Sequence, residues 1–219
     1  MIPEAAIFDL DGTLLDNNAY HLKAWQEYLK LNGRELSDEE YKVNFNGRTN
    51  KDVVEYLYGR KMTDEEAKPY YLEKEALYRK IYEADIQPVA GLIDLLNELY
   101  NRHIPMAIAT SGITVNINFM FKHVAIKKYF SAVVHSMHIK KGKPDPEIYL
   151  KSAEMLNVAP ENCVAFEDAL VGIRSAKGAA MKVIALTTTH AAEELQEADK
   201  VIKDYTEIDL KQISLLFRF

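Results

Sequence analysis

Two carboxylates near the start of the chain have the spacing of a metal or acid–base site. Asp9 and Asp11 follow the apolar run Ala6–Phe8, and Gly12 comes directly after them. The side-chain period of a strand is two residues, so both carboxylates would point to the same side at its end. Hard cations take oxygen ligands, and paired carboxylates in different environments divide into acid and base roles. In isolation, these residues also fit a helix cap or a surface turn.

A hydroxyl pair and a lysine in later segments suit the binding of a phosphate. Thr110 and Ser111 follow the apolar run Met106–Ala109 and precede a helical pattern. Their hydroxyls and the next backbone amides would suit an anion. Lys143 lies in a loop that prolines stiffen. The alternatives are a helix N-cap for the hydroxyl residues and a solvated side chain for the lysine.

A second acidic pair follows another apolar run. Glu167 and Asp168 come directly after Cys163–Phe166 and precede a helical pattern that begins at Ala169. The carboxyl ends of parallel strands are where α/β sheets bind ligands. We expect both residues at that edge, with Asp168 as the stronger candidate for a metal ligand.

The segments around these residues predict a doubly wound, Rossmann-like α/β core with a parallel sheet. Apolar runs of strand length alternate with segments in which apolar residues have helical spacing. Strand then helix, repeated, is typical of a parallel sheet covered by helices. The expected strands are Ala5–Phe8, Met106–Ala109, Cys163–Phe166, Lys182–Leu186 and a weaker one at Ala132–Val134.

The stretch from residue 17 to residue 85 interrupts this alternation and is predicted to be an inserted α-helical cap. It has no convincing strand run and is rich in Tyr, Lys and Glu. It leaves the core just after the first strand, so it should stand over the carboxyl ends of the strands. We predict a core domain of residues 1–16 and 86–219 and a cap domain of residues 17–85, in keeping with a chain of 219 residues.

Composition and charge narrow the kind of protein. The chain is 48% hydrophobic and 27% charged, and no apolar run approaches the ~18 residues of a membrane span. A net charge of −6 without a basic face argues against binding nucleic acid. Cys163 is the only cysteine, and the N-terminal residues carry no secretory signal, so we expect a cytoplasmic protein. We also expect a monomer that acts on a small molecule, with no membrane partner.

These segments, taken in order, resemble the signature motifs of the haloacid dehalogenase superfamily. The resemblance spans nearly the whole chain and implies that one aspartate attacks a phosphoryl group and becomes an aspartyl phosphate. That residue is Asp9, while Asp11 protonates the leaving oxygen and later takes a proton from water or an alcohol. The matching motifs are Asp9-Leu10-Asp11-Gly12-Thr13, Thr110-Ser111-Gly112, Lys143-Pro144 and Glu167-Asp168.

The resemblance also implies a Mg²⁺ cofactor and a phosphate site. The implied metal ligands are Asp9, the backbone carbonyl of Asp11, and Asp168, with Glu167 assisting directly or through water. Lys143 and the metal ion would offset the repulsion between the nucleophile and a phosphate dianion. The implied phosphate-binding residues are Thr110, Ser111 and Lys143.

Within the superfamily, the chain resembles the β-phosphoglucomutase-like branch, which holds sugar phosphomutases and many small-molecule phosphatases. The resemblance lies in the run Tyr20-His21-Leu22-Lys23-Ala24-Trp25 and in Gly172-Ile173-Arg174-Ser175-Ala176. It implies that His21 helps to position Asp11 and that Trp25 belongs to the cap near the site.

One departure from the mutase concerns the cap loop Phe45–Asp52. The mutase has a lysine before the glycine that matches Gly47 and an arginine three residues after it, whereas this chain has Asn46 and Asn50. Arg48 is close by, but a displaced guanidinium need not reach the same oxygen. A mutase must hold a second phosphate while the first reacts, so the loss of these cations favours hydrolysis. Arg48 then contacts a substrate that carries a single phosphate, or it contacts no substrate at all.

The sequence therefore predicts a Mg²⁺-dependent phosphatase that acts on a small phosphorylated metabolite, a sugar or polyol phosphate. The alternative is a β-phosphoglucomutase that interconverts β-glucose 1-phosphate and glucose 6-phosphate. A third alternative is a non-catalytic binding module on the same fold, although no catalytic position is missing from the motifs.

Overall fold

A parallel sheet forms the centre of the computed structural model, which describes residues 2–217. Residue 1 and residues 218–219, which the predicted core domain includes, lie outside the described residues. Within the described part, six parallel strands pair in the order β3-β2-β1-β4-β5-β6. They are β1 (Ala5–Phe8), β2 (Met106–Thr110), β3 (Ala132–His135), β4 (Cys163–Glu167), β5 (Lys182–Leu186) and β6 (Lys200–Ile202).

The strand order places a topological switch beside β1. The chain proceeds from β1 to β2 and β3 on one side, and β4, β5 and β6 follow on the other. The crevice outside the carboxyl ends of strands at such a switch is the usual ligand site of an open α/β sheet. The predicted doubly wound, Rossmann-like core is therefore confirmed.

Both faces of the sheet are covered, which explains why its strands are continuous apolar runs. Along β1, alternate residues point to opposite faces, so Phe8 joins one buried cluster and Ile7 joins another. Phe8 also stacks on Phe166 of β4, with ring centroids 4.5 Å apart. These contacts hold the end of β1 firmly against its neighbour.

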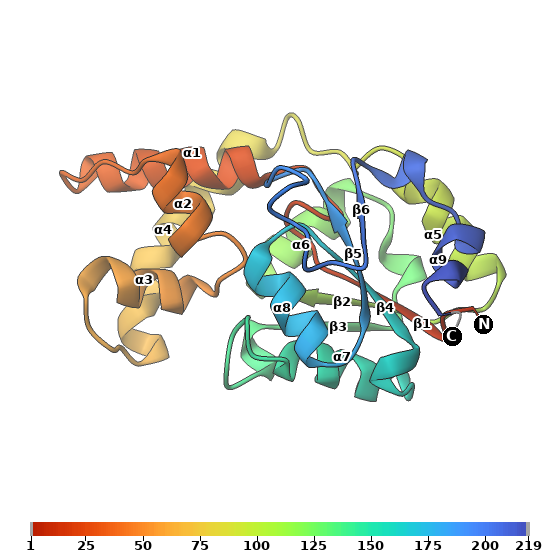
Figure 1. Ribbon diagram of the computed structural model, residues 1–219. Helices are drawn as coiled ribbons and strands as arrows, with labels where there is room; N and C mark the ends of the chain where they lie inside the picture. The colour runs from red at the N-terminus through yellow and green to blue at the C-terminus, as the bar shows by residue number, and fades with distance from the viewer. Residues whose placement is uncertain (1, 218–219) are drawn as a thin grey trace.

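Helices from the core part of the chain form a layer on each face (Figure 1). On the Phe8 face the buried cluster includes residues of α5 (Leu92–Asn101), α6 (Thr114–His123) and α9 (Leu210–Leu215). On the Ile7 face it includes residues of α7 (Glu147–Leu156) and α8 (Leu170–Gly178). Short 3₁₀ turns lie at Lys127–Tyr129, Ser136–His138, Pro160–Asn162 and Tyr205–Glu207.

All five predicted strands are present, but the prediction missed β6. This strand has three residues and pairs with β5 at the edge of the sheet. It begins at Lys200, directly after Asp199, and Lys203 follows its last residue. A short edge strand with charged flanks lacks the apolar run on which the prediction relied.

The segment between β1 and α5 is helical and stands to one side of the sheet (Figure 1). Trp25, Phe45 and Val53 belong to its own buried apolar cluster. Its helices are α1 (Asn18–Leu31), α2 (Asp38–Asn44), α3 (Asn50–Tyr58) and α4 (Asp64–Tyr82). The helical content that the sequence predicted for the cap is therefore present, while the boundaries at residues 16/17 and 85/86 stay a prediction.

The two connections between the cap helices and the core run beside each other. The Val89 amide donates a hydrogen bond to the Leu14 carbonyl, with an N–O distance of 3.0 Å. Leu15 and Pro88 also form an isolated antiparallel bridge. Both connections therefore leave the core at one point, next to the end of β1.

Among residues 2–217, no helix is both long enough and apolar enough to cross a bilayer.

Candidate active site

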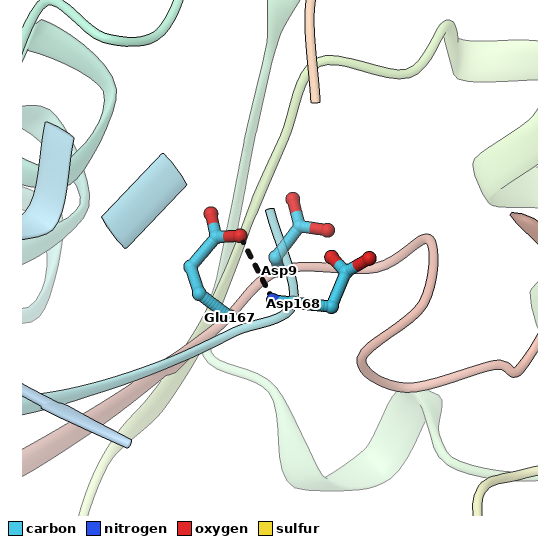
Figure 2. Close-up of side chains that lie close together, drawn as sticks. All are labelled: Asp9, Glu167 and Asp168. Atoms are coloured by element: carbon cyan, nitrogen blue, oxygen red, sulfur yellow. Dashed lines mark hydrogen bonds between the residues drawn. The ribbon is translucent and has the colours of Figure 1, made fainter. Parts of the chain in front are cut away.

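Three buried carboxylates meet where β1 and β4 end. The Asp9 amide donates to the Phe166 carbonyl at 3.0 Å, which continues the pairing of the two strands by one residue. This contact sets Asp9 beside Glu167 and Asp168, and Figure 2 shows the three side chains close together. Each offers one oxygen, and these oxygens all lie within 4.8 Å of one another.

The charges of these carboxylates favour a bound cation. Burial raises the pKa of Asp9 well above its ordinary value, and the neighbouring Glu167 and Asp168 raise it further, against the opposing effect of Lys143. Burial and Glu167 also raise the pKa of Asp168 to about 7. A divalent cation with oxygen ligands would relieve this repulsion. The residues present therefore fit Mg²⁺.

Lys143 supplies a buried positive charge on the other side of Asp9. Its side chain is 2% exposed, and its Nζ donates to Asp9 Oδ1 at 2.6 Å and to Glu167 Oε1. Burial alone lowers the pKa of Lys143, but the two carboxylates outweigh it and raise the pKa above its ordinary value. Lys143 is therefore a charged group of the site, and the alternative of a solvated surface lysine is excluded.

Glu167 is held in place by the start of α8. Its Oε2 accepts hydrogen bonds from the backbone amides of Asp168 and Ala169, at 3.2 and 3.4 Å, and the first of these is drawn in Figure 2. Tyr149 of α7 donates its hydroxyl to Glu167 Oε1 at 2.6 Å. A Cβ atom at Gly172 would lie 2.1 Å from the carboxylate carbon of Glu167, so this turn of the helix needs glycine.

Asp11 lies among polar groups contributed by the cap helices and the connection to them. Asn17 Nδ2 donates to Asp11 Oδ1 at 2.6 Å, and His21 Nε2 lies 3.2 Å from the same oxygen. Lys74 Nζ lies 2.8 Å from His21 Nδ1. The Lys74 ammonium group can only donate, so His21 Nδ1 must accept. The ring proton of His21 therefore lies on Nε2, which donates to Asp11. This arrangement agrees with the predicted positioning role of His21.

These contacts also determine the charge of Asp11. Burial alone raises the pKa of Asp11, but His21, Asn17 and Lys74 together outweigh burial and lower the pKa below its ordinary value. The carboxylate of Asp11 is therefore anionic in this arrangement. Asp9 and Asp11, two residues apart on one strand end, occupy environments that shift their pKa values in opposite directions.

Thr110 and Ser111 line the same cavity as Asp9 and Asp11. Neither caps α6, because that helix begins at Thr114 after the N-cap residue Ile113. Thr110 is buried, and its Oγ1 accepts from the Gly112 amide at 2.9 Å. Ser111 Oγ donates to the Gly47 carbonyl at 2.9 Å, so its hydroxyl joins the core to the cap loop.

The cap loop reaches the core at Gly47, which has a φ of 73°. A Cβ atom there would lie 2.8 Å from side-chain atoms of both Ala169 and Val171, so glycine permits the close approach. Arg48 and Trp25 line the cavity as well, while their contact with a substrate stays a prediction. The Nε atom of Arg48 has no hydrogen-bond partner among residues 2–217.

The sequence of this chain is similar to those of known enzymes. The chain matches the family model of the haloacid dehalogenase-like hydrolases over residues 6–186. It belongs to this family. It is 32% identical to a fructose-1-phosphate phosphatase from Escherichia coli over 81% of this chain and 93% of that protein. It is 30% identical to a β-phosphoglucomutase from Bacillus subtilis over 95% of this chain and 92% of that protein.

Among solved structures, a member of the same family has a similar fold. The hydrolase resembles the crystal structure of a haloacid dehalogenase hydrolase of family IA, variant 3, from Entamoeba histolytica. The TM-score is 0.86 and the sequence identity 34%, over 97% of this chain and 98% of that chain. The expected superfamily is thereby confirmed.

Sequence reasoning missed several polar residues of the hydrolase site. Asn17 and Asn18 follow the first strand, Tyr41 lies in α2, Asn116 in α6, and Lys74 and Glu75 lie in α4; all are buried. A signal for the last two was present in the sequence. The buried residues of α4 are Ala67, Lys74, Glu75, Tyr78 and Tyr82, which lie on one face of a helix. A charged pair within such a stripe indicates a buried polar site.

Proposed function

We propose that this hydrolase is a Mg²⁺-dependent phosphatase that acts on a small sugar or polyol phosphate through an aspartyl phosphate on Asp9. One observation carries the proposal. Asp9 is a buried carboxylate at a strand end, with Lys143 at 2.6 Å on one side and two further carboxylates within metal-binding distance. The similarity to a fructose-1-phosphate phosphatase supports the substrate class.

The site is arranged for an anionic nucleophile to approach an anionic phosphate. Mg²⁺, held by Asp9, Asp168 and the Asp11 carbonyl with Glu167 assisting, would supply positive charge that offsets their repulsion. Lys143 adds a second positive charge at the nucleophile. Thr110 and the backbone amides after it would hold the phosphate oxygens that are not transferred.

Hydrolysis would proceed in two displacements at phosphorus. Before the first, Asp11 takes up a proton from solvent when the phosphate dianion binds beside it, because nearby negative charge raises its pKa. An Asp9 oxygen then forms a bond to phosphorus, the bond from phosphorus to the ester oxygen breaks, and Asp11 gives this proton to that oxygen. In the second, a water oxygen attacks the same phosphorus, its proton passes to Asp11, and the bond to Asp9 breaks. The second step requires anionic Asp11, the form that His21, Asn17 and Lys74 stabilise.

The shape of the site would protect the reaction from bulk water. The cavity that contains Asp9 and Asp11 has a volume of about 60 Å³, room for only a few water molecules. It is next to a groove of about 1100 Å³ between cap and core, and Arg48 and Asn50 line both. A sugar phosphate would enter from this groove while cap and core are further apart, and react once they close.

A β-phosphoglucomutase is the second candidate, because one relative with that name is 30% identical over most of the chain. A mutase returns the phosphoryl group to a sugar, so it must hold a molecule with a phosphate at each end. The two candidates differ in the acceptor of the second displacement, which is water in one case and a sugar hydroxyl in the other.

Phosphate release separates these candidates. The protein with Mg²⁺ would be screened against sugar and polyol monophosphates, and β-glucose 1-phosphate would also be followed by NMR for conversion to glucose 6-phosphate. A phosphatase releases inorganic phosphate at the rate at which ester is lost. Formation of glucose 6-phosphate without phosphate release would instead identify a mutase. A monomeric state and a cytoplasmic location stay predictions.

A further inference from the structure

The cap side of the cavity carries polar groups that the proposed chemistry does not use. Asn46 comes from the loop after α2, Asn50 from the start of α3 and Glu75 from α4, and all three line the cavity that contains Asp9. Asn46 is 5% exposed, and its Oδ1 is buried with no hydrogen-bond partner among residues 2–217. A buried acceptor without a donor is costly, so this oxygen suits a group that a ligand supplies.

A chain of hydrogen bonds that starts at a carboxylate of the acidic cluster determines which atom of Asn46 is free. Asp168 Oδ2 accepts from Asn18 Nδ2 at 2.8 Å, which leaves Asn18 Oδ1 on the other side of that amide. Asn18 Oδ1 accepts from the Tyr41 hydroxyl at 3.1 Å and from Asn46 Nδ2 at 3.3 Å. If the Asn46 amide were rotated by 180°, its Oδ1 would face Asn18 Oδ1, and two acceptors would lie in contact without a donor. Asn46 therefore presents an acceptor to the cavity.

Glu75 lies in the same cavity and is fully paired. It is 2% exposed. Its Oε1 accepts from Asn50 Nδ2 at 2.8 Å and from Lys74 Nζ at 3.0 Å, and its Oε2 accepts from Asn116 Nδ2 at 2.6 Å. Burial alone raises the pKa of Glu75, but Lys74 and the hydrogen bond from Asn116 oppose it, and the pKa lies below its ordinary value. The carboxylate is therefore anionic, its charge is paired with Lys74, and each of its oxygens already has a donor.

The positive charge of Lys74 is not available to a ligand. Its Nζ is shared between Glu75 Oε1 and His21 Nδ1 and lies 5.1 Å from the centre of the Trp25 ring. Arg48 lies at the border with the outer groove, which it also lines. Glu75 is paired with Lys74 in the same way, and Arg48 adds positive charge, so the cap side has no excess of negative charge. Its free acceptor is Asn46 Oδ1, which suits a donor from a ligand.

Sugar and polyol hydroxyls can donate to such an acceptor, whereas an alkyl chain cannot. We propose that Asn46 selects leaving groups that carry hydroxyls. Asn46 Oδ1 accepts a hydrogen bond from a substrate hydroxyl. This inference rests on the proposed phosphatase function and assigns a specificity residue to it.

The hydroxyl preference is tested with two esters of similar length, mannitol 1-phosphate and hexyl phosphate, of which the second has no hydroxyl on its chain. The wild type should prefer mannitol 1-phosphate in kcat/KM. In Asn46→Leu this preference should fall about fivefold, the scale of one neutral hydrogen bond. The control is Asn44→Leu, the same change two residues earlier and outside the cavity, which should keep the wild-type preference. An unchanged preference in Asn46→Leu would overturn the role of Asn46.

Failure of this inference can be told apart from failure of the proposed function. Each comparison is a ratio of two substrates on one variant, so a partly unfolded preparation does not change it. Acetyl phosphate, which has a very small leaving group, reports the phosphatase chemistry by itself. No phosphate release from acetyl phosphate or any ester would overturn the proposed function, and the inference with it. Release without the hydroxyl preference would overturn the inference alone.

Discussion

Asp9 and Asp11 lie two residues apart, and the structure gives them opposite electrostatic surroundings. Asp9 faces two carboxylates and a lysine in a buried site, which raises its pKa. Asp11 faces His21 and Asn17, which lower its pKa. In the proposed mechanism, a Mg²⁺ ion bound beside Asp9 would lower this raised pKa and keep the nucleophile anionic. The lowered pKa of Asp11 suits the base that takes a proton from water in the second displacement.

A change at the proposed nucleophile gives the most direct test. Asp9→Asn should abolish turnover, because an amide oxygen is a poor nucleophile and cannot form the acyl phosphate. Phosphate release and incorporation of labelled phosphate into the protein would both be measured, with circular dichroism to confirm the fold. Substantial turnover by this variant would refute the proposed mechanism.

Lys74 should affect catalysis without contacting phosphate. It lies 2.8 Å from His21 Nδ1, and His21 lies 3.2 Å from Asp11. Lys74→Met should lower kcat about tenfold, below the ~10²-fold or larger loss expected when an acid–base group itself is removed. The KM for acetyl phosphate should change little. Lys80→Met, at an exposed position of the same helix, should have wild-type kcat, and an equal loss in both variants would contradict the role of Lys74.

At the scale of elements, the start of α8 and the end of β4 form one unit that holds the acidic pair. The backbone amides of Asp168 and Ala169 point at Glu167, and Gly172 leaves room for its carboxylate. The cap loop touches the same turn, because Gly47 packs against Ala169. The position of this helix therefore affects both the proposed metal site and the contact with the cap.

A methyl group at Gly172 should disturb this unit. In Gly172→Ala the new Cβ would lie 2.1 Å from Glu167, and such overpacking costs about 1–3 kcal/mol of unfolding free energy. Weaker Mg²⁺ binding should accompany the loss, and urea denaturation with metal titration would measure both. The control Gly178→Ala lies in the same helix, where the nearest atom to a new Cβ is 3.5 Å away. That variant should be as stable as the wild type or slightly more stable.

At the scale of the whole molecule, core and cap build one cavity together. The core provides the two aspartates Asp9 and Asp11 and the phosphate-binding segment, while the cap provides His21, Lys74, Asn46 and Glu75. Ser111 and Gly47 join the two parts by a hydrogen bond of 2.9 Å. Reaction chemistry and leaving-group selection thus come from different parts of the chain.

Metal binding should stabilise the whole protein. A ligand that binds only the folded state at about 100 times its Kd adds about 2.7 kcal/mol, which corresponds to a rise in Tm of about 5–10 °C at this chain length. Thermal unfolding with and without Mg²⁺ would measure the shift, and EDTA should abolish phosphate release. Asp168→Ala removes a proposed ligand and should show a much smaller shift. Equal shifts in both proteins would place the metal elsewhere.

The sequence by itself determined the sheet and the residues at its edge. Apolar runs, the two-residue period of strands and the polar residues at strand ends are local patterns, so five of the six described strands were predicted correctly. The structure brings the proposed catalytic residues together at the ends of these strands, and their roles stay a prediction. The edge strand β6 was missed because its three residues carry little of that pattern.

Only the tertiary structure decided which cap residues face the catalytic aspartates. Lys74 and Glu75 lie on the buried stripe of α4, but the packing of α4 against α1 decides which groups they contact. The free oxygen of Asn46 depends on hydrogen bonds with Asn18 and, through it, with Asp168, which is far away in the chain. Hydrogen-bond partners and directions arise from contacts between distant segments, so no local pattern of residues contains them.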